Sequence, residues 1–134
     1  MYPEEKIREP VFSLGGLAMS FTESITAVLS NYANFSGRAS RSEFWWFYLF
    51  GLLLTWAAQI LETVTIGNSY TSVIVGLALL VPSWAVGARR LHDKDRSGWW
   101  QLLIFTIIGI VVLIYWFATP GTEGKNRFGI KPEK

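Results

Sequence analysis

The sequence predicts an all-α membrane protein: a three-span helical bundle preceded by an N-terminal amphipathic interfacial helix. Its 134 residues are 51% hydrophobic and only 16% charged, whereas a soluble domain carries about 25% charged residues. Three stretches without any charged residue each approach the ~20 residues that a helix needs to cross a bilayer core. A soluble protein with three such helices would have too little amphipathic surface to cover them.

The N-terminal part is expected to lie outside the membrane core. Residues 1–13 are predicted to be a flexible tail, because they contain two prolines and several charges. No basic-then-apolar pattern of a cleavable signal peptide is present in them. Within residues 14–33, apolar side chains recur every three or four positions, which predicts an amphipathic helix. That helix either lies flat on the membrane interface or packs against the cytoplasmic ends of the spans.

The membrane domain is expected to cover residues 34–134, with spans at about 44–61, 70–88 and 99–117. Helices are the expected form, because lipid offers no hydrogen-bond partners to the backbone. The stretches also lack the alternation of a membrane β-barrel. Pro82 is expected to kink the second span. Gly109 is expected to permit close packing or a break in the third.

The basic residues predict the orientation. They form three clusters: Lys6, Arg8, Arg38 and Arg41; then Arg89, Arg90, Lys94 and Arg96; then Lys125, Arg127, Lys131 and Lys134. The connection between the first two spans has none, so the N-terminus and the second loop are predicted to be cytoplasmic. Three full spans, the preferred interpretation, place the C-terminus outside despite its charge. Alternatively, a third segment that bends at Gly109 and returns to the cytoplasmic side would leave the C-terminal tail in the cytoplasm.

The first polar block reads NYANFSGRASRSEFWW over residues 31–46. Ser40 and Glu43 have the spacing of a capping box, in which each side chain bonds the other residue's backbone. Arg38 and Arg41 flank this predicted cap. The following tryptophans are expected to anchor the helix at the membrane interface; they are Trp45 and Trp46.

The second polar block, RRLHDKDRSGWW over residues 89–100, has the same construction. Arginines precede a pair of tryptophans, Trp99 and Trp100, which are again expected to anchor a span. Asp93 and Asp95 interleave with the basic residues and are expected to neutralise them in pairs. The tail, TPGTEGKNRFG over residues 119–129, is rich in turn-forming residues.

The three blocks, in this order and spacing, resemble the DUF805 family of small bacterial inner-membrane proteins. The resemblance covers about Asn31 to Gly129 and rests on NYxNFxGRxxRxEFW, RRLHDxxRSGWW and GTxGxNRFG. It implies a multi-pass protein of the bacterial inner (cytoplasmic) membrane. The family name marks a domain of unknown function, so the resemblance implies no biochemical role. It leaves the first thirty residues largely uncovered.

The sequence gives little support to catalysis or to a cofactor. It contains no cysteine and a single histidine, and His92 with two nearby aspartates does not specify a metal geometry. The predicted spans contain no ionisable residue, although an intramembrane enzyme or a proton-coupled transporter usually carries one there. We therefore expect no enzyme, no cofactor and no metal. A net charge of only +2 gives no reason to expect nucleic-acid binding.

A collar of charged residues is expected at the cytoplasmic ends of the spans, comprising Arg38, Arg41, Glu43, Arg89, Arg90, Asp93, Asp95 and Arg96. In the structural interpretation the acids pair with the arginines and lock the helix ends together. In the functional interpretation the surplus arginines bind anionic membrane lipids or an acidic protein partner. The predicted function is a non-catalytic binding or assembly module. The alternative is a small homo-oligomeric channel or transporter.

Overall fold

The computed structural model of the chain describes residues 19–65 and 70–132. Its elements, in chain order, are α2 (Phe21–Ser30), α3 (Arg41–Val64), α4 (Thr71–Asp93), the 3₁₀ helix η2 (Gly98–Phe105) and α5 (Ile107–Ala118). No strand occurs among the described residues, so the predicted all-α class is confirmed. The predicted tail at residues 1–13 lies outside the described residues.

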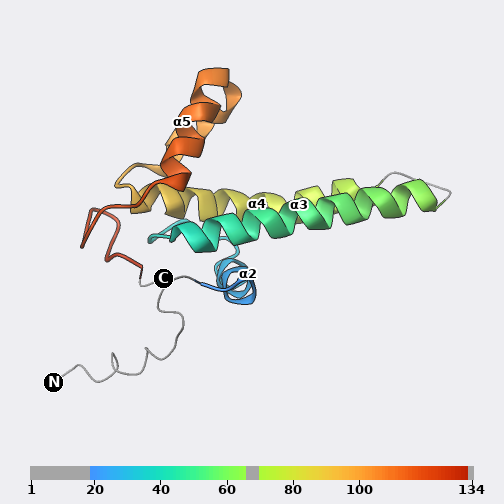
Figure 1. Cartoon of the computed structure of the whole chain (residues 1–134), viewed down its shortest axis with the longest axis horizontal. Coiled ribbons are helices and arrows are strands. Elements are labelled where there is room, and N and C mark those ends of the chain that lie inside the picture. Colours follow the sequence, from blue (N-terminus) through green and yellow to red (C-terminus); the bar gives the residue numbers. More distant parts are fainter. Residues whose placement is uncertain (1–18, 66–69, 133–134) are drawn as a thin grey trace.

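Helices α3 and α4 form a long antiparallel pair (Figure 1). Both are long and apolar enough to cross a membrane, judged by length and composition. Ser40 caps α3 by accepting from the backbone N–H of Glu43. At the far end, the Glu62 carboxylate accepts from the backbone N–H of Ser72 at 3.1 Å and from its hydroxyl at 2.8 Å. This contact joins the last turn of α3 to the first turn of α4. Helix α4 continues through Pro82.

Most large apolar side chains of α3 and α4 are exposed, including Trp56, Ile60 and Leu77. An exposed apolar surface of this extent is unusual for a soluble monomer and marks contact with a membrane or a partner. The buried core instead lies at the end where α3 begins and α4 ends, which we call the collar end. It consists of Val28, Ala39, Phe44, Phe47 and Val86.

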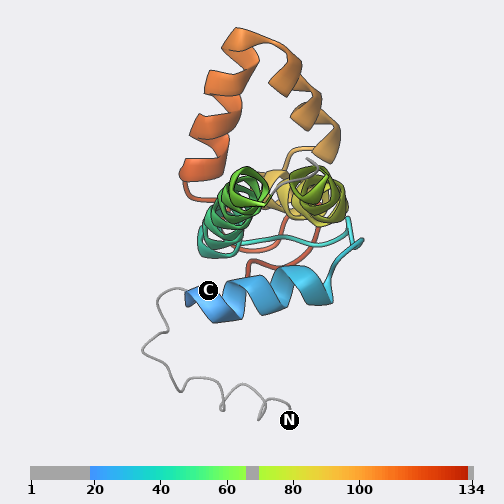
Figure 2. The ribbon, with the colours of Figure 1, turned by 90° about the vertical axis from the view of Figure 1, so that its right-hand side faces the viewer.

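The third apolar segment is not a single helix. Its first half is η2, and the chain breaks at Thr106, whose backbone is extended and whose hydroxyl accepts from the N–H of Gly109 at 2.9 Å. The two halves fold back as a hairpin that projects from the collar end (Figures 1 and 2). A side chain at Gly109 would meet the carbonyl oxygen of Leu103 at 2.2 Å, so this glycine permits the tight return.

The three-span prediction is therefore supported only in part, because among the described residues only α3 and α4 are long and apolar enough to be candidate spans. Helix α5 has 12 residues, which is ~18 Å at 1.5 Å per residue and short of a bilayer core of ~30 Å. The predicted break is present, but it falls at Thr106 rather than at Gly109. Both ends of the third segment consequently lie at the collar end.

Helix α2 lies inside the predicted range 14–33. It begins with a complete capping box between Ser20 and Glu23, and its buried face carries Ser24 and Val28. The Ser24 hydroxyl donates to the carbonyl of Ser42 at 3.2 Å. The helix packs across the start of α3, on the side opposite to the η2–α5 hairpin (Figure 2). It therefore packs against the ends of the long helices, the second of the two predicted arrangements.

Candidate functional site

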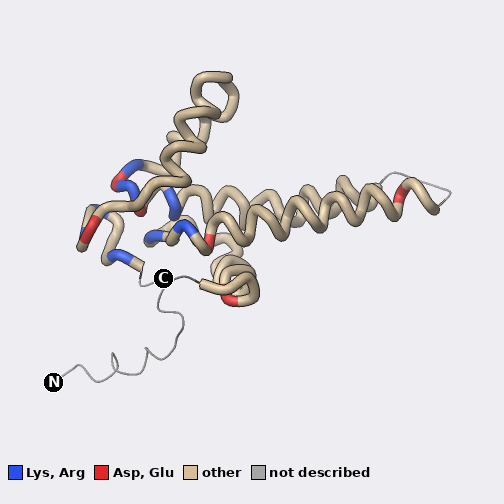
Figure 3. The backbone as a smooth tube through the Cα atoms, in the orientation of Figure 1, with Lys and Arg blue, Asp and Glu red and all other residues tan. Residues whose placement is uncertain are grey.

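Charged residues are segregated along the α3–α4 pair. Every described lysine and arginine lies at the collar end, while Glu62 stands alone near the other end (Figure 3). The first polar block begins α3, the second ends α4, and the tail follows α5. The fold thus brings together three blocks that are far apart in the sequence.

Two buried arginines share one buried carboxylate. Arg38 donates from Nε to Asp93 Oδ1 at 2.9 Å, and Arg90 donates from Nη1 to Asp93 Oδ2 at 2.6 Å. The Arg38 and Arg90 side chains are fully buried and that of Asp93 is 6% exposed. We call these three residues the arginine hub. With two cations and one anion it has an excess positive charge, which other groups must stabilise.

Backbone carbonyls from the third apolar segment and the tail supply that stabilisation. Arg38 donates to the carbonyl oxygens of Thr122, Gly124 and Gly129. Arg90 donates to those of Phe117 and Thr119. These bonds satisfy guanidinium donors that burial would otherwise leave unpaired.

The tail also bonds directly to the carboxylate-bearing residue of the hub. The N–H of Thr122 donates to the carbonyl of Asp93 at 2.7 Å. Gly121 lies so close that a Cβ there would be 2.0 Å from Asp93 Oδ2. The tail therefore covers the hub, and it can do so only with glycine at position 121.

A second buried ion pair joins α4 to the first turn of α3. Arg89 donates from Nη1 to Glu43 Oε2 at 2.7 Å and from Nε to the carbonyl of Asn34 at 3.2 Å. The carbonyl of Arg89 accepts from Ala39 N–H at 2.9 Å. The Glu43 carboxylate is thus directed to Arg89, and the described contacts at Ser40 give only the hydroxyl half of the predicted capping box.

His92 is held by neighbouring polar and aromatic groups. Its Nδ1 lies 2.8 Å from the carbonyl oxygen of Gly37. Its ring stacks on Phe128 with centroids 4.0 Å apart, and its carbonyl accepts from the side chain of Asn126. Within residues 19–65 and 70–132, no group of three or more His, Asp and Glu side chains is arranged to hold a metal ion.

Asp95 lies apart from the hub. It follows the C-terminus of α4 with φ of 61°, and the N–H groups of Asp95 and Arg96 bond back to the helix in a Schellman arrangement. Its partner is Arg127 of the tail, which donates to it from backbone N and from Nε, each at 3.2 Å. Partial desolvation raises the pKa of Asp95, but the hydrogen bonds from Arg127 outweigh it and lower the pKa overall.

Three basic side chains surround the segment where α5 joins the tail, and we call them the outer basic cluster: Arg41, Lys94 and Arg96. Arg41 donates to the carbonyl of Ala118 at 3.3 Å. Lys94 donates to the Thr119 hydroxyl at 2.7 Å, and the Arg96 guanidinium lies 4.2 Å over the Trp116 ring. In the described part of the chain, none of the three has a carboxylate partner.

The four predicted anchor tryptophans differ in their surroundings. Trp45 donates from Nε1 to the carbonyl of Phe117 at 3.1 Å, and Trp46 packs edge-on against Phe21. Trp100 packs edge-on against Trp116. Trp99 is 79% exposed on the hairpin.

Comparison with known proteins identifies the family. A family model described as "Protein of unknown function (DUF805)" matches residues 32–130, which includes all three blocks that meet at the collar end. The chain belongs to the DUF805 family. This DUF805 chain is 40% identical over 112 residues to the inner membrane protein YhaH of Escherichia coli (strain K12), covering 79% of this chain and 93% of that protein.

Other relatives are similar over most of their length. Inner membrane protein YhaI of the same strain is 42% identical over 109 residues, covering 80% of the DUF805 chain and 92% of YhaI. The uncharacterized protein YiiR is 28% identical over 127 residues, covering 72% and 84% of the two chains. No solved structure matches this sequence.

The sequence does not predict two kinds of contact in the DUF805 chain. The tail binds the hub through carbonyl oxygens, which every residue carries, so side-chain identity gives no signal for them. The sequence marks Lys94 and Arg127 only as basic residues, because their contacts with Thr119 and Asp95 depend on the return of the third segment. The glycine at 121 was the one available signal, because glycine permits close approach of backbone to another group.

Proposed function

We propose that this chain is a non-catalytic module of the bacterial inner membrane, whose basic end engages the anionic surface of the cytoplasmic leaflet. The observation that carries the proposal is the gathering of every described lysine and arginine at the collar end. The inner leaflet carries anionic lipids, which attract basic segments near the membrane by about 1 kcal/mol per Lys or Arg. The names of YhaH and YhaI as inner membrane proteins support this location.

The proposed topology has two crossings, with both chain termini in the cytoplasm. Helices α3 and α4 cross the bilayer, and the η2–α5 hairpin enters from the cytoplasmic side and returns. This arrangement gives all three basic clusters the same side, as the positive-inside rule requires. It removes the conflict that three full crossings create for the tail.

The two interpretations of the collar apply to different residues in this proposal. The buried pairs formed by Arg38, Arg89 and Arg90 lock the helix ends and the tail together. Anion binding is assigned to Arg41 and Arg96, which have no carboxylate partner among the described residues. Arginine suits this role because its planar donors match the oxygens of a phosphate.

The competing function is a small channel or transporter formed by several copies. It draws support from the hydroxyls of Thr55 and Ser83, which line a groove between α3 and α4, because hydroxyls can line a pore. The channel is disfavoured because the charges of the hub lie at one end of the long helices and not along them.

Reconstitution separates the two functions. Protein purified in mild detergent is placed in liposomes loaded with a pH-sensitive or ion-sensitive dye, and flux is compared with empty liposomes. If the chain is a binding module, we expect no flux above that of empty liposomes. We also expect anionic lipid or an acidic protein to co-purify with it. Flux above the empty vesicles, proportional to protein content, would contradict the module and favour the channel.

A further inference from the structure

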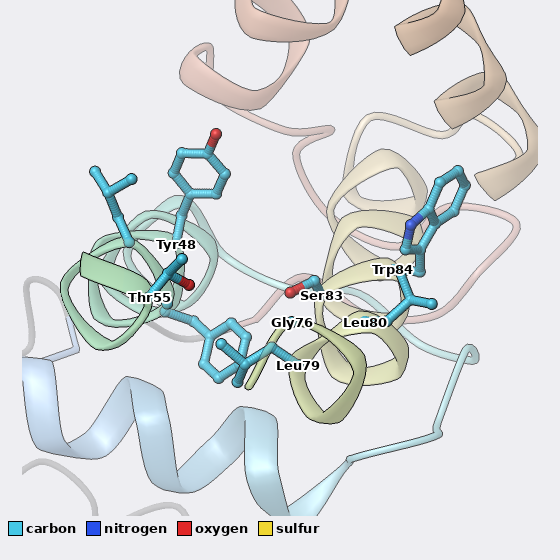
Figure 4. Close-up of a pocket in the computed structure, with 10 residues that line it drawn as sticks. Tyr48, Thr55, Gly76, Leu79, Leu80, Ser83 and Trp84 are labelled. Atoms are coloured by element: carbon cyan, nitrogen blue, oxygen red, sulfur yellow. The ribbon is translucent and has the colours of Figure 1, made fainter. Parts of the chain in front are cut away.

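An apolar groove of about 290 Å³ runs between α3 and α4. Its walls are mainly apolar; Gly51 and Gly76 add no side chain to them, and the small hydroxyl side chains are those of Thr55 and Ser83. A Cβ at Gly76 would meet no atom within 4 Å, so this position opens into free space. Tyr48 and Trp84 flank the groove on the side from which the η2–α5 hairpin projects (Figures 2 and 4).

The groove and the outer basic cluster lie on the same side of α3. Arg41, Trp45, Tyr48, Leu52 and Thr55 are spaced by three or four residues and therefore share one helix face. The last three of these line the groove. Arg41 precedes Tyr48 by seven residues, which is ~10 Å along the helix axis. A cationic group therefore stands about two helical turns from the groove wall.

The outer basic cluster has the character of an incomplete anion site. Each of its three cations contacts at least one residue of the segment from Trp116 to Pro120. None of the three pairs with a carboxylate of the described residues. The Nε of Arg96 is buried and has no hydrogen-bond partner. Burial lowers the pKa of Lys94, and the nearby charges of Arg90 and Arg96 lower it further. An anion here would relieve this repulsion.

We propose that the chain binds one anionic phospholipid, with its phosphate at the outer basic cluster and one acyl chain in the groove between α3 and α4. This site rests on the proposed function and names its ligand. An amphiphile satisfies both features at once: oxygen acceptors for the three cations, and a hydrocarbon chain for the apolar walls. The indole of Trp45 donates to the Phe117 carbonyl and the indole of Trp116 lies under Arg96, so both mark the level at which headgroups and chains meet.

A second copy of the chain fits these features less well. It would have to bring a carboxylate to the cluster, but the described carboxylates are already engaged. Glu43 and Asp93 are buried in ion pairs, and Asp95 and Glu123 are bonded to tail cations. Glu23 caps α2, and Glu62 is bonded to Ser72 at the far end. A zwitterionic lipid would fill the groove equally but would bring no net charge to the cations. The test therefore compares lipids that differ in the charge of the headgroup.

The test measures lipid retained by the full chain, by native mass spectrometry after exchange into mixed micelles containing equal phosphatidylglycerol and phosphatidylcholine. We expect one phosphatidylglycerol per chain. Arg41→Gln and Arg96→Gln should each reduce the preference for phosphatidylglycerol about five-fold, which corresponds to the ~1 kcal/mol contributed by one basic residue near a membrane. Lys125→Gln removes the same charge from the exposed tail, outside the outer basic cluster, and should reduce the preference less than either arginine substitution does.

Gly76→Leu tests the groove. The leucine fills open space, so we expect a folded helix and reduced retention of long-chain phosphatidylglycerol, with no change for the dihexanoyl form. Val73→Leu, on the exposed part of the same helix, is the matched control. Far-UV circular dichroism of each variant separates lost lipid from lost fold.

The outcomes distinguish the site from the proposed function. If the unmodified chain shows no preference for phosphatidylglycerol, both are overturned. If it shows the preference but Arg41→Gln and Arg96→Gln behave like Lys125→Gln, the site is wrong and the proposed function stands. If Gly76→Leu leaves lipid retention unchanged but alters the oligomeric mass, the groove seats a second copy and the proposed site is wrong.

Discussion

The substitution Asp93→Asn tests whether the arginine hub holds the collar end together. Asp93 is the shared partner of Arg38 and Arg90, with N–O distances of 2.8 and 2.6 Å in the two ion pairs. Asparagine keeps the size of the side chain but removes the charge and replaces one acceptor oxygen with a donor. Both guanidinium groups would then remain buried without an anion.

The expected loss follows from the cost of an uncompensated buried charge. Removing one partner of a buried ion pair typically costs about 3–5 kcal/mol, and here one removal affects two cations. We expect the free energy of unfolding to fall by at least about 3 kcal/mol. Adding Arg90→Met should recover part of the loss, because it removes one of the two unpaired charges.

The assay is unfolding in dodecyl maltoside micelles titrated with sodium dodecyl sulphate, followed by helicity. Asp95→Asn is the matched control, because it makes the same change two residues away in an exposed ion pair with Arg127. Asp95 has a left-handed backbone conformation, which asparagine tolerates. Exposed pairs contribute little. Unfolding of both variants at the same detergent fraction would contradict a stabilising role for the hub.

Two further predictions concern the tail. Gly121→Ala would place a Cβ 2.0 Å from Asp93 Oδ2, so the tail should lift and limited proteolysis within it should accelerate; Gly76→Ala, which meets no neighbour, should cleave at the original rate. Acidification should also loosen the tail. The pKa values of Asp95 and Glu123 are lowered by their bonds to Arg127 and Lys131, so their contribution is present above the usual carboxylate pKa values and is lost as pH falls through the lower, folded values. A spin label at Lys125→Cys should therefore keep its mobility between pH 8 and pH 5 and become more mobile only under stronger acid; loosening at neutral pH would contradict this.

The long helices were predictable because their signals are local. Charge-free length and the Ser40 cap are enough to predict α3, and the same length predicts α4. The third segment has an equally long charge-free run, yet it folds as two halves. Its break depends on the Thr106 cap and on the close approach of Gly109 to Leu103, and such an approach depends on the packing of the hairpin.

The sequence shows which charged residues lie near the helix ends, but it does not show how they pair. Ion pairing of Glu43 and Asp93 with arginines follows from their interleaving with basic residues in the sequence. The choice of Arg89 for Glu43, and the sharing of Asp93, require the antiparallel arrangement of α3 and α4. The sequence predicts Asp95 in the collar, but the turn after α4 directs it toward Arg127 of the tail.

Cysteine labelling tests the central claim most directly, namely that the tail and the collar end lie on the same side of the membrane. The chain contains no cysteine, so single cysteines can be introduced at Ser36, Thr65 and Lys125 and exposed to a membrane-impermeant maleimide. The two-crossing account predicts labelling of Thr65→Cys in intact spheroplasts, with Ser36→Cys and Lys125→Cys labelled only after lysis. Labelling of Lys125→Cys in intact spheroplasts would show that the third segment crosses the membrane, and would contradict the account.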